Sequence, residues 1–91
     1  MEYTYFTFPT TYFAIRAEKV VEEQLGEGRA KMVPVPRKIS SSCGTALRCQ
    51  PDKADDIESI LQQQRVEIEG RHQIKEEERL NLKKLFGLNK G

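Results

Sequence analysis

The stretch that decides the fold is residues 3–25, YTYFTFPTTYFAIRAEKVVEEQL. Its first six residues are all aromatic or threonine, and this composition favours a β-strand over Tyr3–Phe8. Pro9 cannot donate a backbone hydrogen bond to a neighbouring strand, so the strand ends there. Thr10 or Thr11 can then cap a helix in which apolar residues recur at helical spacing. The stretch therefore predicts one strand followed by one amphipathic helix.

The rest of the chain continues with the same two kinds of pattern. Three further strands are predicted where apolar and β-branched residues lie between turn-forming residues: Lys31–Val35, Thr45–Cys49 and Val66–Ile68. A second helix is predicted from Pro51, with Asp52 as its N-cap. The order of elements is therefore β-α-β-β-α-β.

This order predicts an α+β, ferredoxin-like domain over residues 1–74. In that plan a four-stranded antiparallel sheet carries two helices on one face, and the first and third strands are central. The second strand lies at an edge, which suits Pro34 and Pro36 because an edge strand tolerates missing N–H groups.

A C-terminal helical extension is predicted over residues 75–91. Leu82, Leu85 and Phe86 share one side of that helix and form an apolar patch. Because a short helix is marginally stable alone, we expect the patch to pack on the open face of the sheet or across a homodimer.

Composition and charge exclude several classes of protein. The 91 residues suffice for one small domain, and a net charge of +1 argues against a dedicated nucleic-acid binder. No stretch approaches the roughly 20 apolar residues of a membrane span, and the N-terminus lacks the basic and apolar regions of a signal peptide. We therefore expect a cytoplasmic protein that has no contact with a membrane and keeps its two cysteines as thiols.

Positive charge is concentrated around the two cysteines. Residues 30–51 contain four basic residues and no acidic one: Lys31, Arg37, Lys38 and Arg48. Cys43 lies in this segment between Ser42 and Gly44. Nearby cations favour thiolate over thiol, and thiolate is the nucleophilic form. The pattern thus predicts a reactive Cys43, and the alternative from these residues alone is a structural cysteine in a polar turn.

The run PVPRKISSSCGTALR, residues 34–48, resembles the signature of the selenium/sulfur carrier protein-like family. These are small bacterial and archaeal proteins that were formerly grouped as a domain of unknown function. The resemblance covers roughly residues 3–74 and is most specific in the residues around Cys43. It implies that Cys43 carries sulfur or selenium as a persulfide or selenopersulfide, received from a donor protein and passed to an acceptor. It also implies a carrier rather than an enzyme with turnover, and no cofactor beyond the carried atom.

The neighbours of Cys43 are expected to support this chemistry. Cations are predicted to stabilise the thiolate, namely Arg37, Lys38 and Arg48, whereas hydrogen bonds are predicted from Ser40, Ser41 and Ser42. Gly44 would keep the approach to the thiol open because it has no side chain.

The second cysteine and the single histidine are expected to have other roles. Cys49 follows Leu47 by two residues, so both are predicted to lie on one buried face of a strand. The alternative is that Cys49 is a resolving thiol, which would form a disulfide with Cys43. Two cysteines and His72 have no recognised metal-ligand spacing, so no metal site is predicted.

Two other functions compete with the carrier. One is a regulatory module that binds a small anion at the segment from Arg37 to Arg48, and the other is a protein-interaction domain without thiol chemistry. The fold cannot separate these functions, because the same architecture hosts many of them. The reactivity of Cys43 can separate them, because only the carrier requires a reactive thiol.

Overall fold

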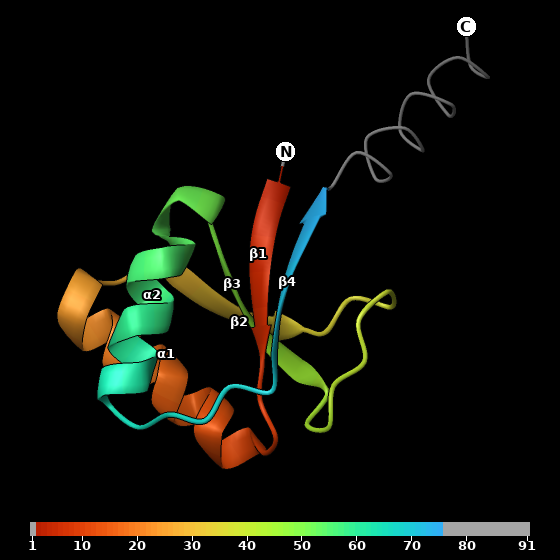
Figure 1. Ribbon diagram of the computed structural model, residues 1–91, viewed down its shortest axis with the longest axis horizontal. Helices are drawn as coiled ribbons and strands as arrows, with labels where there is room; N and C mark the ends of the chain where they lie inside the picture. The colour runs from red at the N-terminus through yellow and green to blue at the C-terminus, as the bar shows by residue number, and fades with distance from the viewer. Residues whose placement is uncertain (1, 76–91) are drawn as a thin grey trace, which may run out of the picture.

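The computed structural model describes residues 2–75 and shows an α+β fold (Figure 1). The elements follow in the order β1 (Glu2–Thr7), α1 (Thr11–Leu25), β2 (Ala30–Pro34), β3 (Thr45–Cys49), α2 (Pro51–Gln63) and β4 (Gly70–Lys75). The four strands form one antiparallel sheet in the order β2-β3-β1-β4. The predictions of central first and third strands and of an edge position for the second are therefore confirmed.

Both helices lie against the same face of the sheet (Figure 1). The core between them is built from alternate residues of the strands, such as Phe6 and Leu47, and from the apolar sides of the helices, such as Val21, Ile57 and Leu61. All five side chains are almost completely buried. The pattern of residues 3–25 thus produces its fold by burying one side of a strand and one side of a helix together.

The loop between β2 and β3, residues 35–44, covers part of the opposite face of the sheet. Ile39 of this loop is only 6% exposed and packs with Tyr5 and Ala46 in a second apolar cluster. The loop that contains Cys43 is therefore anchored to the sheet by a buried side chain. The predicted C-terminal helix, its apolar patch at Leu82, Leu85 and Phe86, and the homodimer through it lie outside the described residues.

The two helices begin in different ways: α1 has a side-chain cap, and α2 begins with a proline. Thr10 caps α1 as predicted, since its side chain accepts a hydrogen bond from the backbone N–H of Phe13 at 3.4 Å. The prediction of Asp52 as the N-cap of α2 is wrong, because Gln50 occupies that position and Pro51 begins the helix. Proline suits the first helical position, where its missing N–H has no partner to lose. Neither described helix is long and apolar enough to cross a membrane.

The prediction of the fourth strand at Val66–Ile68 is also wrong, because β4 begins at Gly70 and pairs with β1 from there. Val66 is buried and Ile68 half-buried against the core beneath the helices, in the segment that connects α2 to β4. An irregular segment that runs along the edge of a core also alternates apolar and polar residues. The alternation therefore indicated burial correctly and secondary structure incorrectly.

Candidate functional site

Cys43 lies two residues before β3, at the end of the loop that follows β2. Its side chain is half-buried and packs against the edge of the core beneath the helices. Gly44 has a φ of 78°, a backbone conformation that other residues rarely adopt, and its carbonyl oxygen accepts a hydrogen bond from the N–H of Val35 at 3.1 Å. This turn directs the chain into β3 directly after the cysteine. A larger residue at Gly44 would meet open space, so the backbone conformation rather than crowding requires glycine there.

The sulfur atom of Cys43 is held mainly by Thr45. Its Sγ lies 3.3 Å from the Thr45 hydroxyl oxygen and 3.3 Å from the Thr45 carbonyl oxygen, and the Ser41 hydroxyl is 3.7 Å away. The thiol can donate its hydrogen to the carbonyl, whereas a thiolate can accept hydrogen bonds from the two hydroxyls. The same groups therefore accommodate both protonation states of the sulfur.

These contacts lower the pKa of Cys43. Partial burial acts to raise the pKa, but hydrogen bonds from the side chain and backbone of Thr45, the side chain of Ser41 and the backbone of Phe8 outweigh it. Thr45 and Phe8 were not predicted as site residues. Among residues 2–75, hydrogen-bonding groups rather than cations account for the direction of this shift.

The structure does not gather the predicted cations and serines at the thiol. Arg37, Lys38 and Ser40 are exposed in the loop, Ser41 contacts the sulfur, and Ser42 points to a carboxylate. Arg48 lies on β3 with its guanidinium 4.5 Å from the centre of the Tyr3 ring. The stabilisation of the thiolate by Arg37, Lys38 and Arg48 stays a prediction, and the structure adds nearer groups with the same effect.

Glu69 fixes the loop beside Cys43. One of its carboxylate oxygens accepts a hydrogen bond from the backbone N–H of Ser42 at 3.1 Å, and the other accepts one from the Ser42 hydroxyl. The backbone N–H of Glu69 in turn donates to the carbonyl oxygen of Thr7 at 2.7 Å. Glu69 thus connects the residue before Cys43 to the end of β1. The sequence offers no local signal for this contact, because 27 positions separate the two residues.

The Ser42–Glu69 contact should open at acidic pH. Hydrogen bonds from the side chain and backbone of Ser42 lower the pKa of Glu69, so its carboxylate stabilises the folded loop at neutral pH and loses this effect as the pH falls through the lowered value. We expect the amide NMR signal of Ser42 to titrate with that pKa in the wild type and to lose the titration in Glu69→Gln.

Glu67→Gln is the matched control, because Glu67 is an exposed residue on the same connecting segment. It should leave the titration of the Ser42 signal unchanged. An unchanged titration in Glu69→Gln would show that another group causes it and would contradict the assigned contact.

Cys49 has the opposite environment to Cys43. It is 3% exposed at the end of β3, on the sheet face covered by the helices, which confirms the interpretation as a buried strand cysteine. Burial raises the pKa of Cys49 to about 11, an effect that Arg71 opposes and Asp52 reinforces. The thiol of Cys49 is therefore protonated at neutral pH.

The two cysteines form no disulfide in this structure. Both are free thiols: Cys43 precedes β3 by two residues, and Cys49 is the last residue of β3. An extended strand advances about 3.3 Å per residue, so Thr45 and Cys49 alone lie roughly 13 Å apart. A disulfide requires Cα atoms within about 7 Å. A resolving role for Cys49 would therefore require the segment between the two cysteines to rearrange.

Within residues 2–75, no group of three histidine, cysteine or acidic side chains is placed to hold a metal ion. His72 is exposed on β4. The chemistry that this site offers is therefore that of one accessible thiol whose thiolate form is favoured by hydrogen bonds.

Comparison with known proteins identifies the family of the chain. A family model described as "Putative Se/S carrier protein-like" matches residues 2–73, which include both cysteines and all six elements up to the last two residues of β4. Comparisons with curated proteins and with solved structures found no match. Because the family model covers most of the chain, the protein belongs to the Se/S carrier protein-like family.

Proposed function

We propose that the protein carries sulfur or selenium on Cys43 as a persulfide or selenopersulfide. The observation that supports this most is the contrast between its two thiols. Cys43 is accessible and has a lowered pKa, whereas Cys49 is buried and has a pKa of about 11. Only Cys43 combines the ionisation and the access that a nucleophilic sulfur needs.

Loading of the carrier is an exchange between sulfur atoms. The Cys43 thiolate attacks the outer sulfur of a donor persulfide, a bond forms between Sγ and that sulfur, and the sulfur–sulfur bond of the donor breaks. The donor leaves as a thiolate, so charge is conserved and no external oxidant or reductant is required. With a selenopersulfide donor the same step transfers selenium.

Unloading reverses the direction of attack. A nucleophile of an acceptor protein attacks the outer sulfur or selenium, and Cys43 leaves as a thiolate. A thiol with a low pKa leaves faster. The hydrogen bonds from Thr45 and Ser41 to Cys43 would thus assist both steps, since each has the Cys43 thiolate as reactant or product.

The residues around Cys43 are assigned the following roles. Arg37 and Lys38 are exposed in the loop and would attract the negative charge of a persulfide or of a partner surface. Ser40 lies beside them, and Gly44 leaves the approach to the sulfur open. The carrier would act with a donor and an acceptor protein in a reducing compartment, the cytoplasm, with no cofactor except the carried atom.

We also assign the domain to the ferredoxin-like plan, which the central positions of β1 and β3 in the sheet support.

Loading can be tested by intact-mass analysis after incubation with a small-molecule persulfide donor. The wild type should gain the mass of one sulfur atom, and dithiothreitol should remove it. Cys43→Ser should gain nothing, because Cys49 is buried and protonated. Cys49→Ser is the matched control and should load like the wild type.

The same experiment separates the carrier from its rivals. A small-anion-binding regulatory module or an interaction domain without thiol chemistry would show no stable adduct on any variant. An adduct that persists in Cys43→Ser would place the chemistry on Cys49 and would contradict the proposal.

A further inference from the structure

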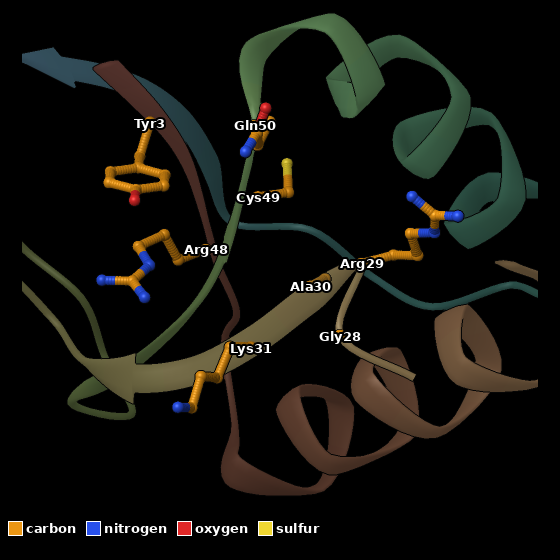
Figure 2. A pocket seen from close by; sticks show the side chains of 8 residues that line it. All are labelled: Tyr3, Gly28, Arg29, Ala30, Lys31, Arg48, Cys49 and Gln50. Atoms are coloured by element: carbon orange, nitrogen blue, oxygen red, sulfur yellow. The ribbon is translucent and has the colours of Figure 1, made fainter. Parts of the chain in front are cut away.

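A second feature of the molecule lies at the other end of β3 from Cys43. A shallow pocket of about 170 Å³ is formed where β2 begins, β3 ends and Tyr3 of β1 lies nearby (Figure 2). Three basic residues and no carboxylate line it. The volume equals that of roughly five to six water molecules in the liquid, which is enough for one phosphate group with a small substituent.

Two of the basic residues form a like-charged pair across the sheet. Lys31 of β2 and Arg48 of β3 are direct partners in the β2–β3 register. Figure 2 shows both side chains extending to the same side, whereas Arg29 extends in the opposite direction. Like charges directly opposite each other destabilise a sheet.

Neither cation of this pair has an ion-pair partner among residues 2–75. The ion pairs at Arg71, with Asp55 and Glu58, do not include Lys31 or Arg48. A bound anion would neutralise the repulsion between the two cations. The placement of two like charges opposite each other in one pocket thus points to an anionic ligand.

Tyr3 orients one of the two cations. The Arg48 guanidinium lies 4.5 Å from the centre of the Tyr3 ring, a distance typical of cation–π stacking. Stacking holds the plane of the guanidinium and leaves its N–H groups at the edge to donate. A planar fork of donors matches the oxygen atoms of a phosphate, and a lysine ammonium adds a second positive charge.

We propose that this pocket binds a small phosphate-bearing molecule, with Arg48 and Lys31 as its ligands and Tyr3 as the residue that positions Arg48. The site is separate from the Cys43 loop and does not depend on thiol chemistry. A doubly charged phosphate is favoured over a single carboxylate because two cations face the ligand.

The proposal can be tested by titrating ¹⁵N-labelled protein with inorganic phosphate at constant ionic strength, with chloride as the control anion. We expect saturable shifts of amide signals that are centred on residues 29–31 and 48–50. Lys31→Gln and Arg48→Gln should each weaken binding at least about fivefold, because each removes one charged ligand. Arg37→Gln is the matched control: it removes a cation from the same basic segment but outside the pocket, and it should leave affinity unchanged.

A second readout uses thermal stability. Without phosphate, Lys31→Gln should melt at a higher temperature than the wild type, because the repulsion with Arg48 is gone. At the same phosphate concentration, the melting temperature of the wild type should rise more than that of Lys31→Gln. Shifts that do not saturate, shifts centred on residues 37–44, or an equal loss of affinity in Arg37→Gln would each overturn the proposal.

Discussion

Thr45→Val is expected to slow the alkylation of Cys43 by about threefold to tenfold at a pH below the thiol pKa. The substitution keeps the branched shape of the side chain and removes the hydroxyl that lies 3.3 Å from Sγ. A hydrogen bond to a charged group contributes about 1.5–3 kcal/mol, and solvent at this half-buried site reduces that figure. The greater nucleophilicity of a more basic thiolate offsets part of the loss. The measurement is the pH profile of the alkylation rate in a Cys49→Ser background.

Two further variants make this test specific. Thr45→Ser retains the hydroxyl and should keep a profile close to that of the wild type. The double variant Arg37→Gln/Arg48→Gln removes the cations that the sequence predicts to stabilise the thiolate, and its effect should be smaller because solvent and salt screen exposed charges. If the double variant raises the pKa of Cys43 more than Thr45→Val does, the assignment of the main cause to Thr45 is wrong.

Ile39→Ala is expected to lower the free energy of unfolding by about 2–4 kcal/mol. Ile39 is the loop residue that packs on Tyr5 and Ala46, so truncation leaves a cavity between the loop and the sheet. Because the loop also contains Cys43, amide hydrogen exchange of residues 37–44 should accelerate. Urea denaturation and hydrogen exchange measure the two effects.

Ile15→Ala is the matched control for the truncation. Ile15 is 59% exposed on α1, so the same change of side chain should alter the free energy of unfolding by less than about 0.5 kcal/mol. Equal effects of the two substitutions would show that Ile39 does not anchor the loop.

The parts of the fold that were predictable are those whose signal is local. The aromatic and threonine residues of β1 and the Thr10 cap of α1 act within a few positions, and β3 lies at the predicted Thr45–Cys49. β4 gives a weaker signal. It is an edge strand whose side chains are mostly exposed, so its apolar pattern is faint, while Val66 beside it is buried without being in a strand.

The candidate site divides in the same way. The position of Cys43 in a loop and the burial of Cys49 follow from neighbouring residues, since Cys49 shares a strand face with Leu47. The contact of Glu69 with Ser42 joins residues 27 positions apart, and only the folded chain brings them together. The predicted cations lie close to Cys43 in the sequence. The hydroxyl of Thr45 is nearer to the sulfur in space, and a count of charges does not reveal it.

Carriage of sulfur or selenium by Cys43 can be measured as the intact mass of the protein purified without reductant, followed by peptide mapping. We expect a fraction of molecules to be heavier by one sulfur or selenium atom, with the added atom on the peptide that contains Cys43 and released by dithiothreitol. The Cys43→Ser protein should show only its unmodified mass. An added atom found on Cys49, or an adduct retained in the Cys43→Ser protein, would show that Cys43 is not the carrier residue.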